Sequence, residues 1–272
     1  MIPEETLFRG KAFLGLMKRY VVNYTNAHDQ SQTVSIMEDD YLLRMGDHLV
    51  CGRDADYAIA TRKQLDQFPG LGLTVHEIWT SGERLAMRFS EHGASLRHGG
   101  NRASWGGIGL YSWNGAKLTA NNVEQDYLSR ARQLKSGQPL SVESPAIAPW
   151  DTEPEPADPR AVAIVDQWLK NGGIDRTPDV QHDDQWAGVA SSPLLDQREI
   201  IVNDIFSCGP AVAFHATQVG RIIGDAGPAE ALTPDVEGRL HMAGIVHVDQ
   251  DRVARGRIIR NRLDLERTLA RS

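Results

Sequence analysis

The sequence has 272 residues, 41% of them hydrophobic and 24% charged, and a formal net charge of −7 at pH 7. A chain of this length is long enough for two compact cores, and its composition is that of a globular protein. The acidic balance, with no block of Lys or Arg, argues against a nucleic-acid or anionic-membrane surface, because either would need a basic field.

The sequence shows no pattern typical of a signal peptide, a membrane span or a disulfide framework. The first residues, "MIPEETLFRG", begin with acids and contain no apolar run of signal-peptide length. No stretch approaches the roughly 18 apolar residues that a membrane span needs. Cys51 and Cys208 lie far apart without CxxC spacing, so no disulfide framework is expected. These features predict a soluble, cytoplasmic protein.

Residues 136–159, "SGQPLSVESPAIAPWDTEPEPADP", break the pattern of the chain. The segment is rich in proline and acidic residues and has no hydrophobic period, which is typical of an extended linker. It divides the chain into a first domain, residues 1–135, and a second domain, residues 160–272.

The first domain opens with helical segments. Apolar residues recur at helical spacing along residues 9–27: Phe13, Leu16, Met17, Tyr20, Val21 and Tyr24. Asp29 is a plausible cap for a short second helix that ends near Met37. A strand broken at Gly46 follows, and residues 56–70 predict a third helix that ends at Pro69-Gly70.

A run of strands comes next. Two strands joined by a tight turn at 81–83 occupy residues 71–94, a third ends at the Asn114-Gly115 turn, and a fourth covers 117–127. Helices followed by consecutive antiparallel strands indicate an α+β fold.

The strand pattern occurs twice in the chain. The hairpin that contains Val75 and Gly82 recurs with Val202 and Gly209 at an offset of 127 residues, and the closing strands repeat at an offset of 135. The region before the second hairpin is shorter than before the first. The copies are therefore related but not equivalent, and we expect the second to be a non-catalytic scaffold.

The pattern "VxxIxxxGxxxA" in both hairpins, with the closing segments "AKLTANNVEQDYLSRARQL" and "DRVARGRIIRNRLDLERTL", resembles the SnoaL-like branch of the nuclear transport factor 2 superfamily. The resemblance implies two cone-shaped α+β barrels, each a curved antiparallel sheet around a pocket with N-terminal helices packed into it. It also implies sheet-to-sheet pairing, here as an intramolecular pseudo-dimer, with a homodimer of whole chains as a further possibility. The fold hosts cyclases, isomerases, dehydratases, epoxide hydrolases and non-catalytic proteins.

The same resemblance points to Arg88 and Asp126 as catalytic. Asp126 in "QDYL" matches the catalytic aspartate of limonene-epoxide-hydrolase-like relatives, and Arg88 matches their pocket arginine. A carboxylate beside a guanidinium would serve as general base with a bidentate anion donor. Ser90, a predicted substrate contact, replaces the second aspartate of those relatives, which disfavours epoxide hydrolysis. The alternative is a structural ion pair or two charges on the outer face.

Asp47 and His48 form a second candidate catalytic pair. In steroid-isomerase-like relatives a general-base aspartate follows the first strand at about this place, and histidine carries protons near neutral pH. The alternative is that Gly46-Asp47-His48 is simply a turn.

Aromatic residues on the strands of the first domain favour a pocket for a flat ligand. The predicted substrate contacts are Tyr24, Trp79, Trp105 and Tyr111, with core packing as the alternative. The nine histidines lack HxH or HxxxH spacing beside a carboxylate, and no GxGxxG motif occurs. No metal site and no cofactor are therefore expected.

These features together predict a cofactor-independent acid–base enzyme acting on a bulky aromatic or polyketide-like molecule. A lyase of retro-aldol type, for example on a lignin-derived aromatic compound, or an isomerase or cyclase is favoured. The alternatives are an epoxide hydrolase or dehydratase of the same fold, or a non-catalytic protein that binds a small hydrophobic ligand.

Overall fold

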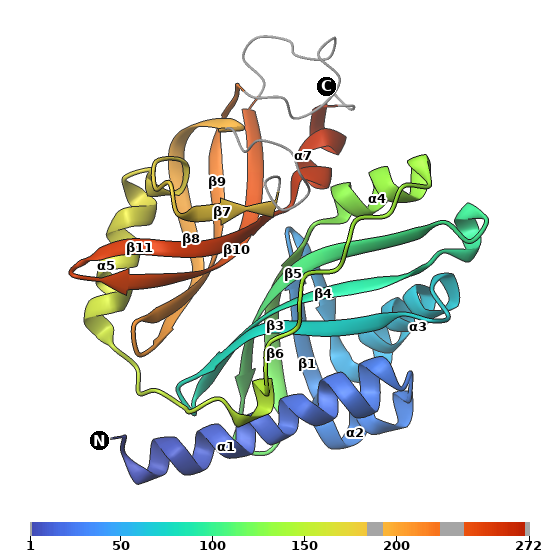
Figure 1. Cartoon of the computed structure of the whole chain (residues 1–272), viewed down its shortest axis with the longest axis horizontal. Coiled ribbons are helices and arrows are strands. Elements are labelled where there is room, and N and C mark those ends of the chain that lie inside the picture. The colour runs from blue at the N-terminus through green and yellow to red at the C-terminus, as the bar shows by residue number, and fades with distance from the viewer. Residues whose placement is uncertain (1, 184–192, 224–236, 270–272) are drawn as a thin grey trace.

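The computed structural model describes residues 2–183, 193–223 and 237–269, which form two units that each combine a curved sheet with helices (Figure 1). In the first unit, the strand order is β2-β1-β6-β5-β4-β3. Its elements are α1 (Glu4–Lys18), η1 (Arg19–Asn26), η2 (Gln30–Gln32), α2 (Thr33–Ile36), β1 (Met37–Met45), β2 (His48–Cys51), η3 (Gly52–Tyr57), α3 (Ala58–Gln67), β3 (Gly72–Thr80), β4 (Arg84–Ala94), η4 (Leu96–His98), β5 (Arg102–Trp113), β6 (Leu118–Gln125) and α4 (Tyr127–Ser136).

The second unit has the strand order β7-β11-β10-β9-β8. Its elements are α5 (Pro159–Lys170), η6 (Gly173–Asp175), β7 (Val180–His182), β8 (Leu195–Cys208), β9 (Ala211–Ile222), β10 (Glu237–Asp249), β11 (Arg252–Arg260) and α7 (Arg262–Leu269). Among its described residues, η6 and β7 are the elements between α5 and β8. The predicted α+β class with two curved sheets is confirmed.

Alternation along the strands separates an inner from an outer face of the first sheet. On β4, Leu85, Met87 and Phe89 belong to the core under the helices, whereas Ala86 belongs to a separate cluster between the two sheets. That cluster joins Ala86, Ile108 and Leu110 of the first sheet to Phe206, Ala213, Ala243, Ile245 and Ile259 of the second. The two sheets therefore pack through their outer faces.

Polar contacts reinforce the packing between the sheets. The guanidinium of Arg84 donates two hydrogen bonds to the carboxylate of Asp204, at 3.1 and 2.5 Å, and lies 4.4 Å from the ring centroid of Phe206. Glu124 and His215 are both fully buried and lie 2.8 Å apart. Buried polar groups need such partners, so this interface is specific as well as apolar.

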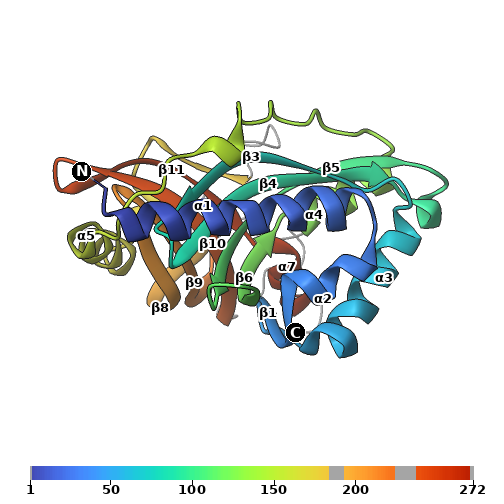
Figure 2. The ribbon, with the colours of Figure 1, turned by 90° about the horizontal axis from the view of Figure 1, so that it is seen from below.

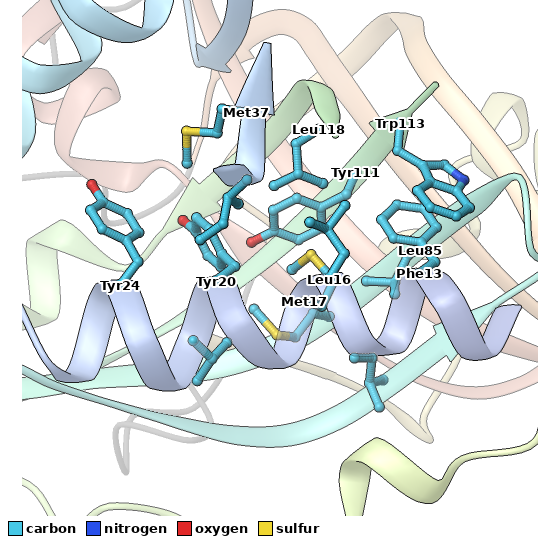
Figure 3. Packing of buried hydrophobic residues seen from close by; sticks show 14 of the residues in the cluster. Phe13, Leu16, Met17, Tyr20, Tyr24, Met37, Leu85, Tyr111, Trp113 and Leu118 are labelled. Carbon is cyan, nitrogen blue, oxygen red and sulfur yellow. The ribbon is translucent and has the colours of Figure 1, made fainter. Parts of the chain in front are cut away.

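Helix α1 continues into η1 and covers the inner face of the first sheet. Figure 2 shows α1 running along this unit, with α2 and α3 gathered at its far end. Phe13 stacks on Trp113 with 4.6 Å between ring centroids, and Leu16 and Met17 are fully buried beside them. This apolar packing closes one end of the unit (Figure 3).

The linker continues along the edge of the first sheet. Ala146 N donates to Val75 O at 2.9 Å, and Glu155 N donates to Thr80 O at 3.0 Å. The linker therefore covers part of an edge strand that would otherwise expose unpaired backbone groups. No helix in the described part of the chain is long and apolar enough to cross a membrane.

The last strand of the first unit is shorter than predicted. β6 ends at Gln125, because Asp126 caps a helix, α4, that the sequence analysis did not anticipate. The Asp126 side chain accepts a hydrogen bond from Ser129 N at 3.0 Å, which satisfies one of the free donors of the first helical turn.

Candidate functional site: a tyrosine-lined cavity in the first unit

A cavity of about 420 Å³ lies between η1, α3, the start of α4 and the inner face of the first sheet. Of its 26 lining residues, 15 are aromatic or aliphatic and 11 are polar or charged, and small-molecule sites commonly combine apolar walls with polar groups. Its lining includes Tyr20, Tyr24, Leu43, Met45, His48, Val50, Tyr57, Lys63, Gln64, Phe68, Leu73, Phe89, Glu91, Arg97, Tyr111, Asn121, Val123, Gln125, Tyr127 and Arg130.

The chain has six tyrosines, all between residues 20 and 127, and five of them line this cavity. Tyr20 lies 5.9 Å from Tyr111 and 5.7 Å from Tyr24, measured between ring centroids. The sixth, Tyr41, packs edge-on against Tyr57 at 5.2 Å. In Figure 3, Tyr20 and Tyr24 rise from one face of the first helix, and Tyr111 points toward Tyr20 from the sheet.

Burial raises the pKa of each of these phenols, so all six are protonated hydrogen-bond donors at neutral pH. The Tyr24 hydroxyl and the Asn121 amide oxygen are buried in the wall. Thr61 and Tyr57 lie beside Tyr24, and Tyr41 lies beside Asn121, so the phenols belong to a polar network within the wall.

Glu91 is the acidic member of the described lining. It is buried, with 7% of its surface exposed, and its Oε2 accepts a hydrogen bond from Gln64 Nε2 at 2.7 Å. Burial raises the pKa of Glu91 to about 7, although the Gln64 hydrogen bond and the charge of Arg130 oppose this rise. A carboxyl group with such a pKa exchanges protons readily near neutral pH.

Two glycines of β5 leave room for the aromatic wall. A Cβ atom on Gly109 would lie 2.8 Å from the Tyr111 ring, and one on Gly107 would lie 2.5 Å from the Phe89 ring. Real side chains do not approach so closely, so these rings occupy the space that a side chain would take. The "GGIG" segment is therefore part of a continuous strand whose glycines accommodate side chains of the cavity wall.

Four of the predicted site residues lie at or beside the cavity. Tyr24 and Tyr111 line it, and exposed His48, at the start of β2, lies at its mouth. Trp105 lies behind the wall, where its Nε1 donates to Oε1 of the lining residue Gln125 at 2.7 Å.

Arg88 and Ser90 are on the opposite face of the sheet. Arg88 donates to both carboxylate oxygens of Glu143 in the linker, at 2.6 and 3.1 Å, and Ser90 hydrogen bonds with His76 at 2.8 Å. The expected Arg88–Asp126 pair inside the pocket is wrong. Because alternation on β4 places Met87 and Phe89 inward, their neighbours point outward.

Asp126 is fully buried, but between the units rather than in the cavity. Arg262 donates to its Oδ1 at 2.9 Å, and burial, with the charge of Asp183, raises the pKa of Asp126. The aligned Asn261 caps α7 in the same way, accepting a hydrogen bond from Asp264 N at 3.3 Å. A residue that caps the corresponding helix in both units has a structural role.

Asp47 lies in the turn between β1 and β2, with its side chain 71% exposed. It lies 3.3 Å from His241 and 3.7 Å from Arg239 of the second unit, so it faces an interface and not the cavity.

Trp79 is excluded from the cavity by a β-bulge. The register between β3 and β4 shifts by one between Val75 and Glu77, and this shift moves every later side chain of β3 to the other face. Trp79 therefore packs edge-on against His247 of the second unit, with 5.2 Å between ring centroids.

Glu91, Gln64 and Arg130 were missed by the sequence analysis. A usable signal for Glu91 was present: it continues the inward set of Leu85, Met87 and Phe89 at a spacing of two. In the described ranges, the structure contains no group of three or more His, Cys, Asp or Glu side chains arranged to hold a metal ion.

No protein-family model matches the sequence, and no curated protein matches it. Among solved structures, it is similar to a candidate SnoaL-like polyketide cyclase from Jannaschia sp. CCS1, with 15% identity and a TM-score of 0.42 over 47% of this chain and 93% of the other. A phenazine-biosynthesis-related protein from Pseudomonas aeruginosa has 16% identity and a TM-score of 0.39 over 52% and 95% of the two chains. An epoxide hydrolase from M. tuberculosis resembling limonene epoxide hydrolase has 16% identity and a TM-score of 0.37 over 49% and 86%. Each match covers about half of this chain.

Proposed function

We propose that the first unit is a cofactor-independent acid–base enzyme that acts on a small aromatic carbonyl or hydroxylated compound. The observation that carries this proposal is Glu91, a buried carboxyl group with a pKa of about 7 in the wall of a cavity lined by tyrosine rings. A base of this kind is poised to take and return a proton at neutral pH.

Glu91 is the proton-transfer group of this mechanism. Near pH 7 both of its protonation states are present. The hydrogen bond from Gln64 holds one carboxylate oxygen in place while the other gains or loses the proton. The ionised form removes a proton from carbon beside a substrate carbonyl. Its protonated form then returns a proton to a different atom of the same substrate.

The tyrosine hydroxyls are the groups that would stabilise the negative charge of the substrate. Tyr20, Tyr24 and Tyr111 keep their protons because burial raises their pKa values, so they are donors for the oxygen that becomes negative as a proton leaves carbon. Stabilised enolates of this kind are intermediates of isomerases, aldol-type cyclases and retro-aldol lyases. In the last case the base removes the hydroxyl proton, the carbon–carbon bond breaks, and its electron pair forms the enolate.

Deuterium exchange tests the proposal without knowledge of the natural substrate. Aryl ketones and β-hydroxy aryl ketones are incubated with the protein in D₂O, and incorporation beside the carbonyl is followed by proton NMR. We expect Glu91→Gln to lower the exchange rate by about 10²- to 10⁴-fold, the usual contribution of a positioned base. For the wild type, kcat/KM should rise with pH through about 7, as Glu91 ionises.

Glu77→Gln is the matched control. Glu77 lies on the neighbouring strand β3, but it is paired with Arg88 and His247 on the outer face. It should therefore keep the wild-type exchange rate. Equal rates for Glu91→Gln and wild type, or ligand binding without exchange in the wild type, would contradict the enzyme proposal; the second result would identify a non-catalytic binding protein.

A further inference from the structure

The charge of the cavity lining is opposite to that of the whole chain. The chain carries a net charge of −7, yet the described lining contains Lys63, Arg97 and Arg130 against the single carboxyl of Glu91. Lys63 and Arg97 are exposed and lie at the mouth. A cavity with cations at its mouth and in its wall attracts anionic ligands.

Arg130 is the cation held inside the wall. Its guanidinium carbon lies 4.0 Å from the ring centroid of Tyr127, 5.0 Å from Trp105 and 5.8 Å from Phe68. Three rings on one cation restrict its orientation and provide cation–π stabilisation. Burial lowers the pKa of Arg130, but an arginine stays charged at neutral pH.

The guanidinium of Arg130 makes no hydrogen bond and no ion pair with the described residues, while other half-buried arginines of the chain have carboxylate partners. Arg84 is paired with Asp204, and Arg88 with Glu143. A guanidinium has five N–H donors, and the ionised form of Glu91 attracts the charge of Arg130 without a hydrogen bond to it. Because Arg130 lines the cavity, these N–H donors are available to a ligand bound there.

We infer that the cavity recognises aromatic carboxylates, with the carboxylate bound by Arg130 and the ring packed among Tyr20, Tyr57 and Tyr111. This inference rests on the proposed function for its location and names the substrate class of the same site. A planar guanidinium binds a carboxylate through two parallel hydrogen bonds. The tyrosine rings provide the flat apolar surface that an aryl group needs.

Isothermal titration calorimetry with 4-hydroxycinnamate and its neutral methyl ester tests the inference. We expect the wild type to bind the acid at least about tenfold more tightly than the ester, because a charge-assisted hydrogen bond contributes about 1.5–3 kcal/mol. Arg130→Gln should abolish this preference while the ester binds as before. Arg130→Lys should restore part of this preference, since lysine supplies the positive charge but not the two parallel N–H donors of a guanidinium.

Arg132→Gln is the matched control, because Arg132 lies on the same helix, is half exposed and pairs with Glu266 at 3.1 Å. It removes the same charge and should keep the wild-type preference for the acid. The inference would be overturned if the wild type binds the acid no more tightly than the ester. It would also be overturned if Arg130→Gln weakens both ligands equally, or if Arg132→Gln has the same effect as Arg130→Gln.

Ligand binding and deuterium exchange test the roles of Arg130 and Glu91 separately. Glu91→Gln should still prefer the acid, because its carboxamide leaves Arg130 in place, whereas it should lose deuterium exchange. Arg130-dependent binding of the acid without any exchange would overturn the enzyme proposal alone. Exchange of neutral ketones with no preference for the carboxylate would overturn the inference alone.

Discussion

The inner faces of the two sheets carry different kinds of side chains, although their hairpins share a sequence pattern. The first presents tyrosines and Glu91 around a cavity, whereas the second is packed with aliphatic side chains: Val165, Leu169, Val212, Leu240, Met242 and Val246 are fully buried there. At the offset of the hairpin repeat, Glu91 aligns with Gln218, and at the offset of the closing strands, Tyr111 aligns with Val246. The second unit thus has no carboxyl group at the position aligned with Glu91, and it contains no tyrosine.

The side chains beneath the helices differ in the two units. Tyrosine rings that contact each other line the cavity of the first unit, whereas the core of the second unit contains mainly aliphatic side chains. In the second unit, α5 packs against the sheet through Val165 and Leu169. The proposed site lies in the first unit, and the outer faces of the sheets join the two units.

The titration of Glu91 gives the largest expected effect on stability. Its folded pKa of about 7 lies above the ordinary 4.5, so between these pH values the folded state binds more protons than the unfolded state. Stability from this group is full below about pH 4.5 and is lost as pH rises through about 7. Glu91→Gln should therefore gain up to about 3 kcal/mol relative to wild type between about pH 5 and pH 9.

Urea unfolding of both proteins across this pH range measures the difference. Titratable groups that both proteins contain contribute equally to their stability and cancel in the difference. Asp126, whose pKa is also raised, is one of them. A stability difference that stays constant with pH would show that Glu91 ionises as an ordinary solvated carboxyl group, and the proposed general base would then be lost.

A smaller effect is expected from a pair of aligned glycines, Gly109 and Gly244. A Cβ atom on Gly244 would lie 2.4 Å from the Phe214 ring, much as one on Gly109 would lie 2.8 Å from Tyr111. Each glycine-to-alanine variant should lose about 1–3 kcal/mol of stability through overpacking. Only Gly109→Ala should also weaken ligand binding, because only there does the displaced ring line the cavity.

Thermal unfolding and calorimetric titration of 4-hydroxycinnamate separate the two variants. Equal losses of affinity in Gly109→Ala and Gly244→Ala would mean that the second inner face contributes to binding as much as the first, which would remove the distinction between the units.

Much of the fold could be predicted from the sequence, because its signals are local. Helical spacing from Phe13 to Tyr24, the turn at Gly82 and the turn at Asn114-Gly115 each determine structure through neighbouring residues. The repeat of the hairpin identified the second sheet. α4 was missed because its capping residue, Asp126, was interpreted as catalytic, although a capping aspartate before a helix is a recognisable signal.

The candidate site was predicted less well, because inward and outward positions differ by one residue. Arg88 and Ser90 were expected in the pocket, but Met87, Phe89 and Glu91 point inward, since adjacent strand residues point to opposite faces. The bulge that turns Trp79 outward has no sequence signal. Arg130 lies on a helix that was not predicted, and its aromatic partners Phe68 and Trp105 come from other elements, so only tertiary structure brings this group together.

We propose that the inner face of the first sheet, and not the interface between the sheets, is the functional site. A crystal structure with 4-hydroxycinnamate bound tests this location most directly. We expect the ring among Tyr20, Tyr57 and Tyr111, with its carboxylate on Arg130. Density for the ligand beside Arg88 or Asp126, or within the second unit, would contradict it.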